Sequence, residues 1–117
     1  KAEPTLFLTA LKDILIPSWK ELGITVEILS STMRTNPLRS ELEQQKINWC
    51  NKYLPDLKLN LVEGSALKQD YAKPNTLLID DFNRTIKQFI IKGGYALHYT
   101  SLNTTMKKLR LLGLSPP

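Results

Sequence analysis

Three groups of polar residues in this sequence could act together on a phosphate group. Ser30, Ser31 and Thr32 follow one apolar run, Lys68 lies in mid-chain, and the pair Asp80–Asp81 closes another apolar run. Hydroxyl groups and backbone amides after a strand suit phosphate oxygens, and a lysine adds a point charge. Adjacent carboxylates repel each other unless a cation relieves them, and Mg²⁺ prefers oxygen ligands. The pattern therefore predicts a phosphoryl-transfer site that lacks one part, the nucleophile.

These groups need a scaffold that brings them to one place. Apolar, β-branched runs predict strands over 24–29, 59–62, 76–79 and 95–99. Helical periodicity predicts a lead-in helix over 5–15 that buries Leu6 and Ile14 and is interrupted at Pro17. It also predicts helices over 37–53, 82–92 and 101–112, with a short helix or turn over 65–71. Asn36 can cap the helix that starts at Pro37 and buries Leu38, and Gly93 can end the helix over 82–92. This alternation indicates an α/β fold, a parallel sheet with helices on both faces. Chemistry in such folds collects at the carboxyl ends of the strands, where the hydroxyl groups and the acidic pair fall.

The composition is that of one globular domain. The chain has 117 residues, of which 42% are hydrophobic and 23% charged. We interpret 1–117 as a single partial domain, with a helical lead-in over 1–23, a core over 24–112 and a tail over 113–117. No apolar run approaches the roughly 18 to 20 residues of a spanning helix, and no signal peptide is evident. We therefore expect a soluble, cytoplasmic protein with no membrane partner.

Two residue counts exclude several kinds of chemistry. Cys50 is the only cysteine, so an internal disulfide and a Cys-rich zinc site are excluded. His98 is the only histidine, and no Gly-x-Ser-x-Gly elbow accompanies it. Because it follows a strand-like run, we expect a packed or edge histidine and not a catalytic one.

Charge is distributed unevenly along the chain. Residues 1–81 hold 10 basic and 11 acidic side chains, whereas residues 82–117 hold six basic side chains and no acidic one. Such asymmetry can mark a surface that binds nucleic acid, although solvated helix faces give the same pattern. No RNA-binding, zinc-finger or helix-turn-helix signature is present, so we do not expect nucleic acid as the main partner.

The ordered set of motifs resembles the haloacid dehalogenase (HAD) superfamily. Ile28-Leu29-Ser30, then Lys68, then Leu77-Leu78-Ile79-Asp80-Asp81 look like its second, third and fourth motifs, with the lysine twelve positions before the acidic pair. The segments 82–86 and 93–97 resemble its 5′-nucleotidase-like and phage-type members. The resemblance implies a HAD-like Rossmannoid fold over about 24–112. It also implies that Ser30 and Lys68 contact the phosphoryl group and that Asp80 and Asp81 hold Mg²⁺.

The sequence departs from the family at its first motif. HAD phosphatases begin with a strand ending in Asp-x-Asp, whose first Asp is the nucleophile, and this sequence contains no Asp-x-Asp. Loss of a covalent nucleophile costs many orders of magnitude in rate, so we expect this chain alone to be inactive. The sheet would also lack its N-terminal central strand, which leaves an exposed seam. Because the chain begins at Lys1, we expect an upstream segment or a partner chain to supply that strand.

Three interpretations remain open. The first is the carboxy-terminal portion of a Mg²⁺-dependent HAD-type phosphohydrolase that acts on a phosphomonoester such as a nucleotide. The second is a non-catalytic HAD-derived structural or interaction module in a larger assembly, such as a phage. The third is a basic nucleic-acid-binding module formed by residues 82–117.

Each candidate residue also has a purely structural interpretation. Ser30 can be a polar strand end and Lys68 a solvated lysine, while Asp80 and Asp81 can cap the next helix. Ser31, Thr32 and Arg34, in the hydroxyl-rich segment, are candidates for binding the substrate phosphate, and Arg34 can equally be a solvated arginine.

Overall fold

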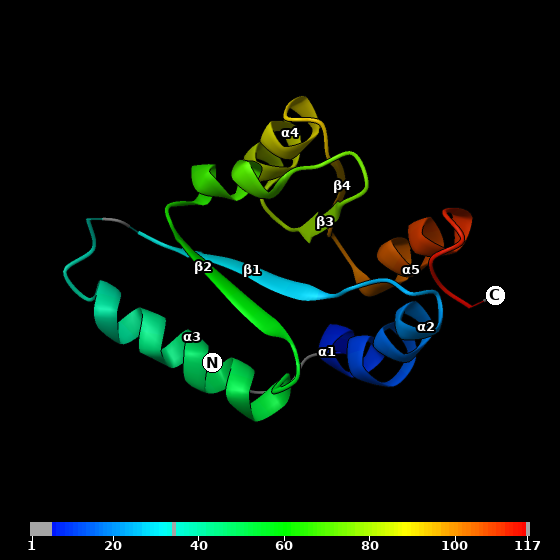
Figure 1. Cartoon of the computed structure of the whole chain (residues 1–117), viewed down its shortest axis with the longest axis horizontal. Helices are drawn as coiled ribbons and strands as arrows, with labels where there is room; N and C mark the ends of the chain where they lie inside the picture. Colours follow the sequence, from blue (N-terminus) through cyan, green and yellow to red (C-terminus); the bar gives the residue numbers. More distant parts are fainter. Residues whose placement is uncertain (1–5, 34, 117) are drawn as a thin grey trace.

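The computed structural model describes residues 6–33 and 35–116 (Figure 1). Helices and strands alternate along most of this part of the chain. The helices are α1 (Leu6–Ala10), a π-helical turn η1 (Leu11–Leu15), α2 (Ile16–Glu21), α3 (Arg39–Tyr53), a 3₁₀ helix η2 (Ser65–Tyr71), α4 (Asn83–Ile91) and α5 (Leu102–Leu111). The strands are β1 (Glu27–Thr32), β2 (Lys58–Glu63), β3 (Leu77–Asp80) and β4 (Tyr95–His98).

The four strands form two parallel pairs instead of one continuous sheet. β1 pairs with β2, from Glu27 opposite Lys58 onward, and β3 pairs with β4, from Leu77 opposite Tyr95 onward. α3 connects the first pair and α4 the second, so the chain contains two β–α–β units. The predicted α/β fold with parallel strands is confirmed, whereas the single sheet is divided.

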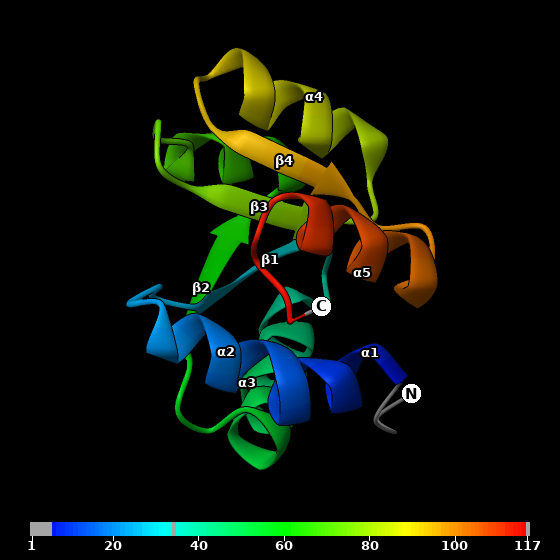
Figure 2. The same ribbon diagram turned by 90° about the vertical axis from the view of Figure 1, so that its right-hand side faces the viewer.

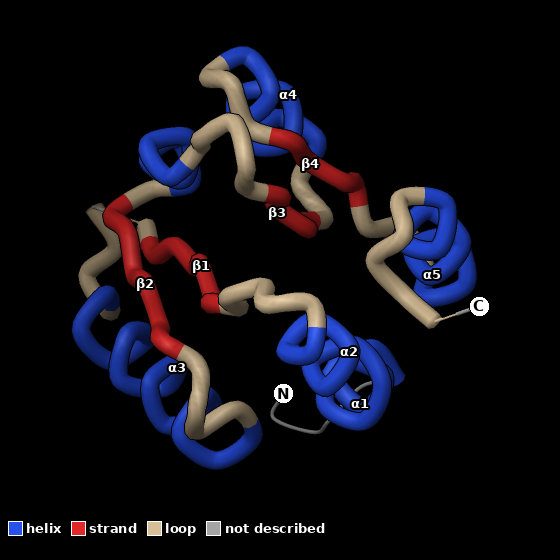
Figure 3. The backbone as a smooth tube through the Cα atoms, turned by 45° about the vertical axis from the view of Figure 1, so that its right-hand side comes forward, coloured by secondary structure: helices blue, strands red, loops and turns tan. Residues whose placement is uncertain are grey.

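The division lies between β1 and β3. Figure 3 shows these two strands as the neighbouring edges of the two pairs, with β2 and β4 on the outside. Within the described residues neither β1 nor β3 pairs with a strand on this side. We call this boundary between the facing edges of β1 and β3 the seam.

The first strand begins and ends later than the sequence pattern predicts. Its predicted range of 24–29 becomes Glu27–Thr32, so the three hydroxyl residues lie within β1 and not in a loop after it. Parallel pairing with β2 continues to Thr32 opposite Glu63. The Thr32 side chain is buried, and a β-branched residue packs well on such a pleated surface.

Helices cover both faces of the β3–β4 pair. Figure 2 shows α4 on one face and α5 on the other. The main core cluster consists of Leu15, Trp19, Leu97 and Leu109, which come from the lead-in helices, β4 and α5. Trp19 Nε1 also donates a hydrogen bond to the backbone oxygen of Leu114, at 2.6 Å, so the start of the predicted tail is attached to the core.

The lead-in helices continue through Pro17, where the sequence predicts an interruption. The π-helical turn η1 directly precedes α2, and Pro17 occupies the first turn of α2, where its missing N–H is tolerated. The wider turn also shifts the buried face. Leu6 and Ile14, which helical spacing places with the core, are exposed, and Leu8 is buried instead.

Two adjacent glycines connect α4 to β4. Gly93 has a φ of +100°, which a residue with a side chain rarely adopts. Gly94 is buried, and a Cβ there would lie 2.6 Å from Cδ2 of Phe89 and 3.1 Å from Cβ of Ala72. The first glycine therefore permits the turn, and the second permits close approach of the backbone to α4.

Membrane-spanning helices are not found in the described ranges, since none of the helices there combines the length and the apolar character needed to cross a bilayer.

Candidate functional site

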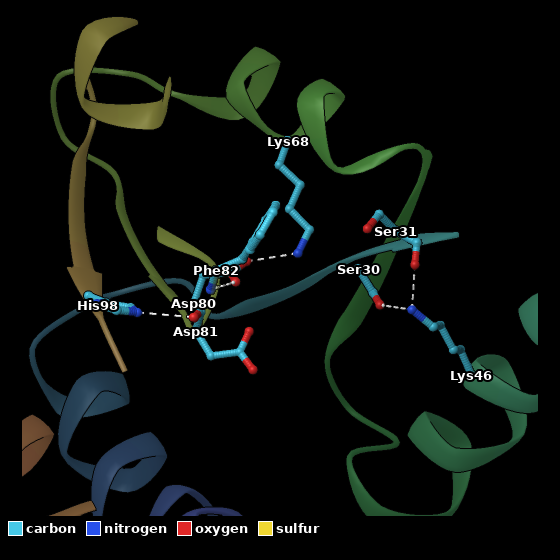
Figure 4. A network of polar contacts seen from close by, with 8 residues as sticks. All are labelled: Ser30, Ser31, Lys46, Lys68, Asp80, Asp81, Phe82 and His98. Atoms are coloured by element: carbon cyan, nitrogen blue, oxygen red, sulfur yellow. Dashed lines mark hydrogen bonds and ion pairs between the residues drawn. The ribbon is translucent and has the colours of Figure 1, made fainter. Parts of the chain in front are cut away.

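Lys68 and Asp80 form a buried ion pair at the carboxyl end of β3. Lys68 Nζ lies 2.7 Å from Asp80 Oδ2, and the two side chains are only 12% and 8% exposed. Asp80 is the last residue of β3, and Lys68 comes from η2, which contacts β1 on the other side of the seam. Figure 4 shows the lysine reaching from η2 to the carboxylate. The structure therefore brings together two residues twelve positions apart that the sequence analysis selected.

The surroundings of Asp80 keep its carboxyl group ionised. Burial by itself raises the pKa of this group, but hydrogen bonds from Lys68 and from the backbone N–H of Phe82, together with the charge of Lys68, lower it more. The net result is a pKa below the ordinary value. The bond from Phe82 N to Asp80 Oδ1, 2.9 Å long, also orders the turn before α4. Asp80 thus carries a buried negative charge and orders the turn before α4, but its side chain does not cap the helix as the structural interpretation expected.

Asp81 is exposed, and its backbone oxygen lies 3.0 Å from Nε2 of His98 on β4. This contact is consistent with the expected edge histidine. Within residues 6–33 and 35–116, no group of three or more histidine, cysteine or acidic side chains could hold a metal ion. Both oxygens of Asp80 already accept hydrogen bonds, from Lys68 and from Phe82, so the pair Asp80–Asp81 alone does not form a metal site.

Ser30 binds a lysine that the sequence analysis missed. Lys46 Nζ, from α3, donates to Ser30 Oγ at 2.6 Å and to the backbone oxygen of Ser31 at 2.5 Å. Figure 4 shows these bonds on β1 and the Lys68–Asp80 pair on the β3 side. Burial lowers the pKa of Lys46, and the positive charge of Lys68 lowers it further. The two ammonium groups therefore repel each other.

The structure does not bring the predicted substrate-binding residues Ser31 and Thr32 to the same place as Ser30. Side chains alternate along a strand, so Ser31 presents its hydroxyl to the face opposite that of Ser30. Thr32 is buried and donates to Oε2 of Glu43 at 3.1 Å, which commits its hydroxyl to α3. Arg34 lies outside the described residues. Of the three hydroxyl residues, Ser30 is the one whose hydroxyl contacts a lysine ammonium group.

A weak signal for Lys46 does exist in the sequence. Cys50 lies four residues after Lys46 on the same helix, so both side chains share one face. Cys50 is buried, and this face lies against the strands of the first pair. Lysines are common within helices, so the spacing of Lys46 and Cys50 alone does not identify a binding residue. The contact with Ser30 on β1 makes Lys46 a candidate.

Comparison with known proteins adds no further guide to function. No protein-family model, no curated protein and no solved structure matches this chain. The geometry consists of two ammonium groups, a hydroxyl group and a buried carboxylate at the ends of β1 and β3. Such a set can bind and neutralise an anion, and it does not include the Asp-x-Asp carboxylates that the resemblance requires.

Proposed function

We propose that this chain is the carboxy-terminal portion of a cytoplasmic, Mg²⁺-dependent HAD-type phosphohydrolase that acts on phosphomonoesters such as nucleotides. A strand ending in Asp-x-Asp, from an upstream segment or a partner chain, completes it. The observation that carries this proposal is the seam. It separates Ser30 on β1 from Lys68 and Asp80 on the other side, where a nucleophile strand would lie.

The backbone of the seam favours an added strand. β1 and β3 each have one edge without a strand partner within the described residues, and an unpaired strand edge readily pairs with another chain. A strand parallel to both would pair with two edges at once and would join the two pairs into one sheet. Its carboxyl end would then lie beside the carboxyl ends of β1 and β3.

The charges favour an acidic end on that strand. Lys46 and Lys68 contribute two positive charges near the seam, and Asp80 offsets one of them. Opposite charges attract strongly in such a partly buried place. A carboxylate or a phosphoryl group at the end of the added strand would neutralise the remaining charge.

The acidic pair Asp80–Asp81 provides ligands of the kind that Mg²⁺ takes. Asp80 and Asp81 would supply carboxylate oxygens, and Mg²⁺ is commonly held by one or two carboxylates together with water and substrate phosphate. When bound, the ion would neutralise charge on the phosphoryl group. In this proposal Lys68 keeps Asp80 ionised and Ser30 orients the phosphoryl oxygens.

Purification of the chain with the segment that adjoins it in its source would test this proposal. The completed protein should hydrolyse p-nitrophenyl phosphate only with Mg²⁺, and the chain alone should not. The double variant Asp80→Asn/Asp81→Asn should abolish the activity, while Asp70→Asn, an exposed acid on η2, should leave it unchanged. Full activity in the double variant would contradict the proposal.

A second candidate function is the non-catalytic interaction module. The observation in its favour is a hollow of about 370 Å³ beside the outer strand β4. Three of its lining residues, Tyr95, Leu111 and Leu112, are large, apolar and exposed by 67%, 87% and 59%. Exposed apolar groups gathered in one place are typical of protein interfaces. Tight association with a partner and no hydrolysis in any combination would support this candidate over the phosphohydrolase.

A further inference from the structure

Lys46 is held in one position by two hydrogen bonds. Its ammonium group donates to Ser30 Oγ at 2.6 Å and to the backbone oxygen of Ser31 at 2.5 Å. Among the described residues it forms no ion pair with a carboxylate. Glu43, three residues earlier on the same helix, lies 3.6 Å from Arg39 and accepts from Thr32. Lys46 is therefore a half-buried lysine whose ammonium group has no acidic partner in the described part of the chain.

The bond from Lys46 fixes what the hydroxyl of Ser30 can do. An ammonium group has three donors and no acceptor, so Ser30 Oγ must accept this bond. The hydroxyl proton of Ser30 is then available to an acceptor. The ammonium group also has a third N–H beyond its two bonds. Lys46 and Ser30 together thus offer two donors and one positive charge.

Ser30 and Lys46 also line a half-open hollow. A hollow of about 170 Å³ is lined by Ser30 and Lys46 together with Ile28, Trp49, Cys50 and Leu59. Because a water molecule occupies about 30 Å³ in the liquid, the hollow has room for a phosphate-sized ion. Its other walls are apolar, which strengthens the attraction between an ammonium group and an anion but also raises the cost of removing the anion from water. The charge of Lys68 acts on the same region.

We propose that Lys46 is a binding residue for a tetrahedral oxyanion such as phosphate, with Ser30 as its partner. This inference rests on the proposed function, because it adds a second cation to that site. In the completed enzyme Lys46 would bind one face of the phosphoryl group through Ser30 and its own N–H. Its contribution is to substrate affinity, whereas Lys68 keeps Asp80 ionised.

The test is a titration of the chain with inorganic phosphate, followed by NMR of ¹³C-labelled lysine side chains. Phosphate should shift the Cε resonance of Lys46, and sodium chloride at equal ionic strength should not. Lys52 is the control, because it is exposed on the same helix with its Nζ 5.1 Å from the centre of the Tyr53 ring. Equal shifts of both lysines, or no shift of Lys46 at millimolar phosphate, would overturn the inference. This measurement on the unaltered protein does not depend on whether a variant folds.

Substitutions of Lys46 measure how much this lysine contributes to phosphate affinity. A hydrogen bond to a charged group contributes enough that Lys46→Met should weaken phosphate binding about tenfold. Lys46→Arg should restore part of the loss, and Lys52→Met should change it less than about twofold, as expected for an exposed charge. Phosphate affinity unchanged in Lys46→Met would refute the role of this lysine.

The completed enzyme separates this inference from the proposed function. If it hydrolyses phosphomonoesters and Lys46→Met leaves KM unchanged, the inference fails and the proposed function stands. If phosphate binds through Lys46 but no completed form hydrolyses an ester, the proposed function fails and the anion site stands.

Discussion

Removal of Lys68 should destabilise the fold in a way that depends on pH. Its Nζ lies 2.7 Å from Asp80 Oδ2, and both side chains are nearly buried. Loss of one partner from a buried ion pair leaves the other charge uncompensated, at a cost of about 3–5 kcal/mol. Because the backbone N–H of Phe82 still bonds Asp80, we expect the lower end, about 3 kcal/mol, for Lys68→Met at neutral pH.

The sign of the pH dependence follows from Asp80. Its pKa in the folded protein lies below the ordinary value, because the bonds and charge of Lys68 and the Phe82 N–H outweigh the effect of burial. Such a carboxyl stabilises the fold above its unfolded pKa, about 3.9, and that stabilisation is lost as pH falls through the folded pKa. Without Lys68, burial is opposed much less and the carboxyl favours its protonated form. The destabilisation by Lys68→Met should therefore be largest at neutral pH and shrink as pH falls through about 4.

Urea unfolding, followed by tryptophan fluorescence over a range of pH, measures this difference. Lys73→Met is the matched control, because Lys73 is an exposed lysine in the segment that leads to β3. The double variant Lys68→Met/Asp80→Asn should recover part of the stability, since it leaves no unpaired charge. A difference between Lys68→Met and the unaltered protein that stays constant with pH would refute the reasoning. So would an equal loss in Lys73→Met.

Two further predictions concern packing and are checked by thermal or urea unfolding. Gly94→Ala should destabilise the fold by about 2–3 kcal/mol, the upper part of the range for overpacking, because its Cβ would overlap the Phe89 ring. Gly23→Ala, where a Cβ meets nothing within 4 Å and only the positive φ opposes it, should cost about 1 kcal/mol. Leu109→Ala, at a fully buried position, should cost about 2–5 kcal/mol, and Leu111→Ala, 87% exposed on the same helix, should stay within about 0.5 kcal/mol. Equal losses in the two members of either pair would show that local packing does not decide stability here.

Periodicity predicted the elements well because each is short and bounded by its own turn signals. All four predicted strands exist, and Gly93 ends α4 as expected. The predicted boundaries of helices and strands were wrong where tertiary contacts determine where an element begins. Asn36 does not start α3 at Pro37. It accepts from Leu38 N at 2.8 Å in a turn, and the helix begins at Arg39. Leu38, predicted as a core residue, is 55% exposed as a result.

The candidate site was predictable only in part. The spacing between Lys68 and Asp80 indicated their proximity, and the structure shows the ion pair. For the three hydroxyl residues, the position along β1 determines what each side chain contacts, because a strand directs successive side chains to opposite faces. That alternation separates Ser30 from Ser31, and pairing with α3 commits Thr32 to Glu43. The helical spacing of Lys46 and Cys50 was only a weak signal, since the contact of Lys46 is with a strand sixteen residues earlier in the chain.

The seam and the charges beside it are independent observations that favour the same completion. Any strand, including an apolar one, could pair with the open edges of β1 and β3. Two lysines alone could be satisfied by any anion in solution. Their combination at the carboxyl ends of β1 and β3 is more selective, since it favours a strand that is parallel, short and acidic at its end. A neutral strand would join the sheets yet leave Lys46 without an anion, so the acidic end is the feature by which a true partner can be distinguished from an adventitious one.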